Sequence, residues 1–193
     1  MFNQILPEAY FDCLSIAHKL DNFLDGFEEK EIHLFAYFSA ILFHYKGAPT
    51  ANWGYKFTID SDGYPHAKVL SDAIKNNEKN GYFEDTGSFL IITGRGTDEF
   101  NKFKKLPTNK KREKYLDAAC STSILIPYKE TKEALLNDPG LKKEQQTNNQ
   151  DWVTYSNEKL KEITTKIGAP SDELLLPAVS WVDYLLKQVH MEN

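Results

Sequence analysis

The stretch KNNEKNGYFEDTGSFLIITGRGTDEF, residues 75–100, contains the clearest succession of structural signals in the chain. Its first residues continue a helical pattern that stops at Gly81, and glycine is the usual residue just past a helix end. The segments YFED and FLIIT, separated by the turn TGS, predict two short strands of a β-ribbon. Thr93 or Thr97 can then cap a helix in which Phe100 falls on the buried side. The stretch therefore predicts a helix, a β-ribbon and a second helix in succession.

The tripeptide Gly94-Arg95-Gly96 inside this stretch raises the question of phosphate binding. A phosphate-binding loop has the pattern GxxxxGK[ST], or GxGxxG within a strand–helix–strand unit. Here the third glycine and the second parallel strand are both missing. We interpret the glycines as serving the backbone, because glycine allows the sharp turn that joins a strand to a helix.

Helical spacing of apolar residues continues on both sides of this stretch. The segment EKEIHLFAYFSAILFHYKG, residues 29–47, is apolar on more than one side and is the expected centre of the core. Prolines, glycines and the turn DSDG indicate a loop over 47–65 with a short strand at 55–59. Further helices are expected at 7–24, 66–80, 108–127, 128–140, 156–168 and 171–191.

Two local features belong to the C-terminal part of this pattern. The polar run 141–151 is a candidate flexible loop, because it has no apolar residue after Leu141. Ser156 or Asn157 is the expected cap of the helix that follows, and Pro177 stands near the start of the last helix or at a kink in it. We expect a mainly α-helical chain with a domain over 1–127 and a helical extension over 128–193 packed on it.

Composition limits the classes of function. With 41% hydrophobic residues, 193 residues form a packed globular protein. The formal net charge of −5 excludes a general polyanion coat, so any nucleic-acid contact must use a local patch. Cys13 and Cys120 stand outside any CxxC pair, which fits a reducing compartment. Without a basic leader or a long apolar run, the chain is expected to be soluble and cytoplasmic, with no membrane contact.

The sequence indicates no catalytic site, no cofactor and no metal site. Its five histidines form neither an HExxH nor an HxH pattern. His33 and His44 flank an apolar helix, where a histidine held by a local hydrogen bond is the commoner case. Cys120 has no partner at a fixed spacing and is interpreted as a packed small side chain. We therefore expect a protein that is not an enzyme.

One charged segment stands out in this acidic chain. Between residues 102 and 114, seven basic residues accompany a single acid, Glu113. Such a cluster attracts phosphate and is a candidate nucleic-acid contact, the alternatives being a solvated helix junction or docking to an acidic partner. The predicted nucleic-acid-binding residues are Lys102, Lys104, Lys105, Lys110, Lys111, Arg112 and Lys114.

The last apolar helix is the candidate protein-binding surface. Trp181, Leu185 and Leu186 lie on it at helical spacing. Large aromatic and aliphatic side chains are the groups that anchor protein interfaces. These three residues are the predicted partner-binding residues.

The order of helix, loop, helix and β-ribbon over residues 30–105, with NGYFE and FLIITGRGTDEF at the ribbon, resembles a winged helix-turn-helix. This resemblance implies a winged-helix core flanked by N- and C-terminal helices. Regulators use that fold, as do subunits that contact only protein. In the helix 66–80, three lysines are mixed with Asp72 and Glu78, whereas helices that read the major groove carry less acid.

The wider layout is similar to that of the small middle components of bacterial ABC-three-component systems, including Lamassu-type anti-phage defence. FNQ at residues 2–4, the helix FAYFSAILFHYKG at 35–47 and the wing carry this resemblance. It implies a non-catalytic accessory subunit of a DNA-sensing complex. The implied partners are an SMC-like ATPase and an effector nuclease, with DNA contact through the complex.

A second resemblance is to Panacea-type antitoxins, through IHLFAYFSAILFHYKGAPT at 32–50 and KVLSDAIKNNEKNGYFE at 68–84. It implies neutralisation of one toxin by direct binding, although the tryptophan-containing ending of that module is not evident here. A third reading is a winged-helix transcription regulator that binds its own promoter. The neighbouring genes, or binding to the promoter, would separate these three hypotheses.

Overall fold

The computed structural model describes residues 5–142, 152–170 and 172–192. These residues are mainly helical, with two small antiparallel sheets of two strands each. The helices are α1 (Pro7–Asp21), α2 (Glu29–Tyr45), α3 (Lys68–Lys79), α4 (Gly94–Phe103), α5 (Pro107–Leu125), α6 (Tyr128–Leu136), α8 (Trp152–Ile167) and α9 (Leu175–Glu192), with the 3-10 turn η1 (Thr50–Trp53). The strands are β1 (Thr58–Ile59), β2 (Pro65–His66), β3 (Phe83–Asp85) and β4 (Leu90–Ile92).

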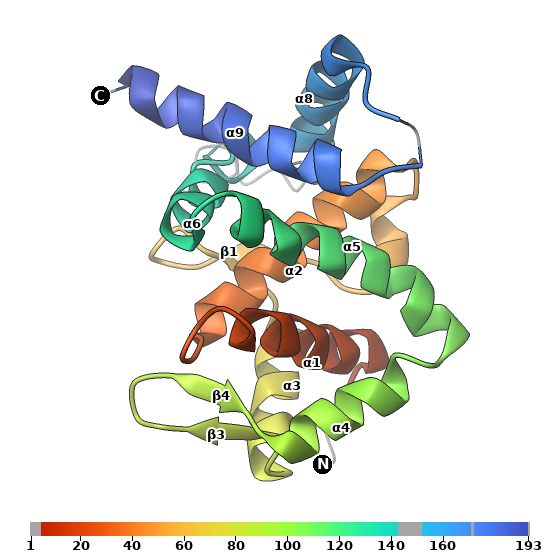
Figure 1. Cartoon of the computed structure of the whole chain (residues 1–193), viewed down its shortest axis with the longest axis vertical. Coiled ribbons are helices and arrows are strands. Elements are labelled where there is room, and N and C mark those ends of the chain that lie inside the picture. Colours follow the sequence, from red (N-terminus) through yellow and green to blue (C-terminus); the bar gives the residue numbers. More distant parts are fainter. Residues whose placement is uncertain (1–4, 143–151, 171, 193) are drawn as a thin grey trace.

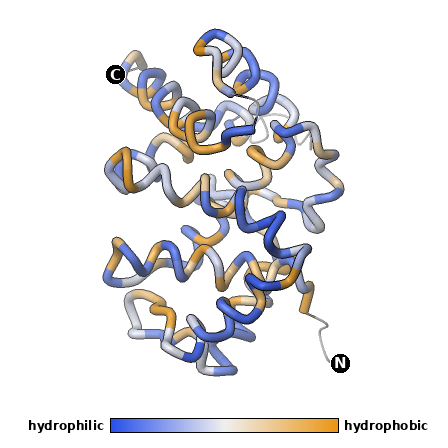
Figure 2. Tube along the Cα trace, turned by 45° about the vertical axis from the view of Figure 1, so that its right-hand side comes forward, coloured by the Kyte–Doolittle hydropathy of each residue, from blue (hydrophilic) through white to orange (hydrophobic). Residues whose placement is uncertain are grey.

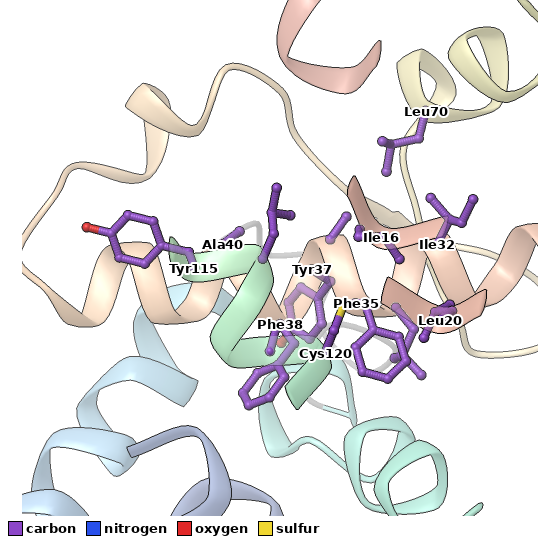
Figure 3. Close-up of a cluster of buried hydrophobic side chains, with 14 of the residues drawn as sticks. Ile16, Leu20, Ile32, Phe35, Tyr37, Phe38, Ala40, Leu70, Tyr115 and Cys120 are labelled. Carbon is purple, nitrogen blue, oxygen red and sulfur yellow. The ribbon is translucent and has the colours of Figure 1, made fainter. Parts of the chain in front are cut away.

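Helix α2 is the centre of the core, as its two-sided apolar pattern predicts. Every residue from Glu31 to Leu42 is buried. In Figure 1, α2 crosses the middle of the molecule between α1 and the C-terminal helices. Figure 3 shows Phe35 and Phe38 of α2 gathered with side chains of α1 and α5, such as Leu20 and Cys120. Helices on all sides of α2 therefore share one hydrophobic core.

Helix α1 is buried on all sides from Phe11 to Ala17, whereas helices nearer the surface bury one side each. In Figure 2, hydrophobic and hydrophilic residues alternate along single helices. Helix α3, for example, buries Leu70, Ala73 and Ile74 while Lys75 and Lys79 stay exposed. This pattern is what the three- and four-residue spacing in the sequence predicts.

The predicted β-ribbon is present, and it contacts a segment that sequence patterns did not connect with it. Strands β3 and β4 pair antiparallel, with Phe83 opposite Ile92. Phe27, in the link between α1 and α2, forms an antiparallel bridge with Leu90 of β4 through hydrogen bonds of 2.9 and 2.8 Å. Helix α1 also packs against α3, α4 and β4. The sequence predicted α1 as a helix that precedes the unit of α2, α3 and the ribbon. These contacts make α1 part of that unit.

Gly96, in the first turn of α4, lies too close to the backbone of Tyr82 to carry a side chain. A β-carbon at Gly96 would lie 2.4 Å from the carbonyl oxygen of Tyr82, so no other residue fits without a backbone shift. The side chain of Thr93 accepts a hydrogen bond from the Gly96 amide at 3.1 Å and caps α4, as predicted. Thr93 Oγ1 also donates to the carbonyl oxygen of Gly81 at 2.8 Å. In these contacts Gly96 serves the backbone, in line with the sequence interpretation.

The loop between α2 and α3 contains η1 and the short hairpin β1–β2. Thr58 pairs with His66, and Ile59 pairs with Pro65. In the intervening DSDG turn, Asp60 Oδ1 accepts hydrogen bonds from the amides of Asp62 and Tyr64. The strand expected at 55–59 is thus limited to its last two residues.

The C-terminal helices pack on α2 and α5, so the hydrophobic core continues across residue 127. The predicted cap at Ser156 or Asn157 is wrong, because α8 begins at Trp152 and both residues lie inside it. Pro177 stands near the start of α9, as predicted. Of the predicted flexible loop at 141–151, Leu141 is buried, and residues 143–151 lie outside the described residues.

Candidate nucleic-acid interface

The basic segment forms the corner between α4 and α5, at the right-hand edge of the molecule in Figure 1. Phe100 fixes α4 against α1, because its ring stacks on the rings of two α1 residues. The ring centres lie 4.6 Å apart for His18 and 6.1 Å apart for Phe11. Pro107 occupies the first turn of α5, where its missing N–H costs nothing. Packing on one side and the proline on the other thus set the geometry of the corner.

Six of the seven predicted nucleic-acid-binding residues are exposed at this corner. We call them the basic face: Lys102, Lys104, Lys105, Lys110, Lys111 and Lys114. Lys102 pairs with Glu99 at 3.2 Å, and Lys104 lies 3.5 Å from Glu113. Among the described residues, Lys105 and Lys110 have no acidic partner, so their charge is open to a ligand.

The single acid of the segment is turned away from solvent. Glu113 is 7% exposed and accepts a hydrogen bond from the hydroxyl of Ser15 at 2.6 Å. Lys19 lies 2.9 Å from its other carboxylate oxygen and balances its charge. Glu113 is thus shared between Lys19 of α1 and Lys104 of the basic face, and no contact with Glu113 offsets the charge of Lys105 and Lys110.

Arg112, the seventh predicted residue, points into the protein. Its guanidinium makes a two-point contact with Asp12 at 2.5 and 2.6 Å and donates to the carbonyl oxygen of Trp53 at 2.8 Å. It also lies 3.5 Å from the centre of the Trp53 ring. These contacts join α5 to α1 and η1, so the structure places Arg112 in the core and outside the basic face.

Burial shifts the pKa values of both members of the Asp12–Arg112 ion pair. Burial raises the pKa of Asp12, and the charge of Arg112 opposes the shift. Burial lowers the pKa of Arg112, but the attraction of Asp12 outweighs it and the net shift is upward. Tyr55 donates its hydroxyl to the same carboxylate at 2.5 Å. The pair is therefore a structural element of the fold.

A cleft of about 480 Å³ opens beside the basic face. Lys111 and Lys114 belong to both the face and the cleft lining. The cleft is also lined by Phe43 and Tyr115, whose rings meet edge to face with centres 5.2 Å apart. Asn52, Thr108 and Asn109 supply amide and hydroxyl groups to its wall. No sequence pattern indicated this cleft, because its lining comes from α1, α2, η1 and α5.

The predicted partner-binding residues of α9 also pack into the molecule. Trp181 has no exposed surface, and its indole N–H donates to Asp138 at 3.2 Å. Leu185 is 1% exposed, and Leu186 is half-buried against the same core. In this structure the three residues hold α9 on the rest of the chain. The most exposed large apolar side chains of the described helices are instead Ile124, Leu125 and Met191.

A serine, two histidines and a glutamate meet where α3 begins, a cluster that the sequence pattern did not reveal. The Ser71 hydroxyl donates to Glu29 at 2.5 Å and lies 3.2 Å from Nε2 of both His33 and His66. The Nδ1 atom of His33 accepts the amide of Ala67 at 3.1 Å, so Nε2 carries the proton.

His33 is not placed to activate Ser71 as a nucleophile. The Ser71 proton points to a carboxylate, and His33 has no free lone pair to receive it. Hydrogen bonds from His33 and then from Ser71 lower the pKa of Glu29 to about 2, so this carboxylate stays ionised. The cluster therefore fixes the start of α3 on α2.

Comparisons with known proteins add no relative to this picture. A scan against protein-family models finds no match, and searches of the curated proteins and of the solved structures find none either. In the described ranges, no group of three or more His, Cys, Asp or Glu residues could hold a metal ion. No helix of those ranges combines the length and apolar character that a membrane span needs.

Proposed function

We propose that this chain is a non-catalytic accessory subunit of an anti-phage defence complex, and that its basic face contacts DNA phosphates. Its partners in this proposal are an SMC-like ATPase and an effector nuclease, which follow from the sequence resemblance. The basic face contributes attraction to the DNA backbone and no reading of base sequence. Contact through exposed lysines alone is typical of non-specific binding, whose dissociation constant is on the order of 10⁻⁴–10⁻⁶ M at physiological salt.

The observation that carries this proposal is the separation of charge at the α4–α5 corner. The six lysines of the basic face are exposed, whereas Glu113 is buried and paired with Lys19. In a chain of net charge −5, such a face is a local site for a polyanion. A solvated helix junction would not require that the one acid be turned inward.

Salt-dependent binding to a labelled DNA duplex tests the DNA contact. For about five phosphate contacts, the logarithm of the binding constant should fall with the logarithm of salt concentration at a slope of about −4.5. The Lys105→Glu/Lys110→Glu variant should weaken binding by about tenfold or more and reduce the slope by about 2. Fluorescence anisotropy at several salt concentrations measures both quantities.

A matched control distinguishes a local effect of the basic face from an effect of the net charge of the chain. Lys129 of α6 and Lys161 of α8 are exposed and lie outside the α4–α5 corner. The Lys129→Glu/Lys161→Glu variant changes the net charge by the same amount and should keep wild-type affinity. Equal losses in the two double variants would refute a local site.

Co-purification tests the accessory role independently of DNA. The full chain, co-expressed with the products of its neighbouring genes, should elute with a large ATPase subunit. Elution as a free protein in every such mixture would contradict the assembly, whatever the DNA result.

A winged-helix topology is the finer fold assignment that we propose for residues 7–103. Its support is the bridge of Phe27 to Leu90, since a winged helix pairs a short segment between its first two helices with the hairpin that follows the third. The connection 46–67 between α2 and α3 departs from the pattern, because a helix-turn-helix joins these helices by a turn of about three or four residues.

This topology favours a transcription regulator as the second candidate function. In that case α3 would enter the major groove, and its exposed Lys75 and Lys79 would face DNA. A Lys75→Glu/Lys79→Glu variant would then lose sequence-selective binding to the chain's own promoter. Under the first proposal, the same variant keeps its duplex affinity.

A further inference from the structure

We infer that the cleft beside the basic face binds one unpaired nucleotide, with the phosphate at Lys111 and Lys114 and the base against Phe43 and Tyr115. The ligand class is a nucleoside phosphate, either free or within a single strand. This inference rests on the cleft, and it extends the proposed DNA contact from the duplex backbone to an unstacked base.

The size and lining of the cleft fit this ligand. Its volume of about 480 Å³ lies within the range of small-molecule sites. Phe43 is half-buried and Tyr115 is 7% exposed, so these aromatic groups form a fixed wall. Aromatic side chains are the usual platform for an unpaired base. The amide of Asn52 can exchange hydrogen bonds with the edge of a base, and Asn109 can accept through Oδ1 while its Nδ2 donates to the carbonyl oxygen of Phe103 at 3.0 Å.

The charge of the cleft favours a phosphate at its rim. Lys111 and Lys114 are exposed, and Lys114 lies 4.8 Å from the centre of the Tyr115 ring. Burial lowers the pKa of Lys46, and the neighbouring charge of Lys114 lowers it further. Asp172 and Glu173 oppose this shift at Lys46, so Lys111 and Lys114 are the lysines that would hold the phosphate. The carboxylate of Glu8 also lines the cleft and can accept hydrogen bonds from an amino or hydroxyl group.

The cleft lies next to the basic face, so one nucleic-acid strand could contact both. Lys110, which belongs to the face, directly precedes Lys111 of the cleft lining. A strand whose phosphates follow the face would thus bring its next nucleotide to the cleft. Single-strand binding generally combines such a basic track with aromatic stacking.

Titration with AMP, adenosine and inorganic phosphate tests the inference on the full chain. AMP should shift the amide resonances of Thr108, Asn109 and Lys111 in a two-dimensional NMR spectrum. It should bind about tenfold more tightly than phosphate, since stacking of one base contributes on that order. Adenosine should also bind more weakly than AMP. Equal binding of AMP and phosphate would overturn the role of the base, and no shift at millimolar AMP would overturn the site.

Two variants locate the ligand without removing a lysine. Thr108 is exposed on the cleft wall, so Thr108→Trp fills the cleft at constant charge and should abolish the AMP shifts. Asn52→Asp keeps the side-chain shape, adds a negative charge and should weaken AMP binding about fivefold or more. The circular dichroism spectrum of each variant checks its fold. AMP binding that persists in both folded variants would contradict the assignment.

Competition with a twelve-residue oligothymidylate separates the two sources of the ligand. Displacement of AMP by the oligonucleotide assigns the cleft to a strand, and AMP binding without displacement assigns it to a free nucleotide. Duplex binding by wild-type and Thr108→Trp protein is the independent readout of the proposed function. Normal duplex binding without AMP or oligonucleotide binding would refute the cleft alone. Cleft-dependent AMP binding without duplex binding would refute the proposed function alone.

Discussion

Asp12 in α1 and Asp138 after α6 are both fully buried carboxylates, yet two regions of the molecule hold them by different chemistry. Asp12 faces a charged partner, the guanidinium of Arg112, which itself stacks on Trp53. Asp138 receives neutral donors, namely the hydroxyls of Tyr37 and Ser156, the indole of Trp181 and the amides of Gly140 and Leu141.

The comparison separates two ways of joining helices. The ion pair connects α1, η1 and α5, whereas the neutral cage connects α2, α8 and α9 around one carboxylate. Removing one ion-pair partner leaves an isolated charge in the core, while changing the cage alters only hydrogen bonds. We therefore expect the region next to the basic face to be the more sensitive to single substitutions.

The largest effect is expected for Arg112→Met, which leaves Asp12 buried without its counter-charge. Breaking a buried ion pair in this way costs about 3–5 kcal/mol. Urea denaturation followed by circular dichroism measures the loss. The double variant Asp12→Leu/Arg112→Met removes both charges and should recover much of that loss. A double variant as unstable as the single one would show that packing on Trp53 matters more than charge.

A smaller loss, about 2 kcal/mol, is expected for Asp138→Asn. The amide keeps one acceptor oxygen but places an NH₂ group among donors, so at least one buried hydrogen bond is lost. The exposed Asp21→Asn is the matched control and should stay within about 0.5 kcal/mol of wild type. Should Asp138→Asn prove as costly as Arg112→Met, the proposed difference between the two regions would be wrong.

Local sequence patterns were sufficient for much of the fold. Apolar spacing predicted the helices and the core position of α2. The threonine before α4 predicted its cap. These features depend on residues that are close together in the sequence. The same reasoning could have placed Arg112. It lies three and four residues before Tyr115 and Leu116, both buried, so all three share one side of α5.

Long-range contacts explain what the sequence could not give. Asp138 finds its donors in α2, α8 and α9, and Phe27 finds Leu90 across two helices, so no local spacing indicates either contact. Trp181 illustrates a different limit. The helical spacing of Trp181, Leu185 and Leu186 predicts that one side of α9 is buried. The same spacing would arise whether a partner protein or the chain itself covers that side. The structure shows that the chain covers it.

A third carboxylate, half-exposed Glu29, extends the comparison through its pH dependence. Its pKa in the folded chain is lowered to about 2, from 4.5 as an ordinary glutamate, first by a hydrogen bond from His33. Its stabilisation is thus present above pH 4.5 and is lost as the pH falls from 4.5 towards 2. Thermal melts should therefore show that Glu29→Gln loses less stability than wild type over this range. Identical acid profiles would remove Glu29 as a contributor.

The smallest effect on stability is expected where the effect on DNA binding is largest. Lys105 and Lys110 are exposed and have no acidic partner among the described residues, so Lys105→Glu/Lys110→Glu should change the unfolding free energy by less than about 0.5 kcal/mol. Arg112 lies two residues beyond Lys110 yet carries the opposite expectation, because it points inward to Asp12. Urea denaturation at the salt concentration of the binding assay compares the two variants directly. A large loss of stability in the lysine variant would mean that its weaker DNA binding reflects unfolding and that the basic face is part of the scaffold.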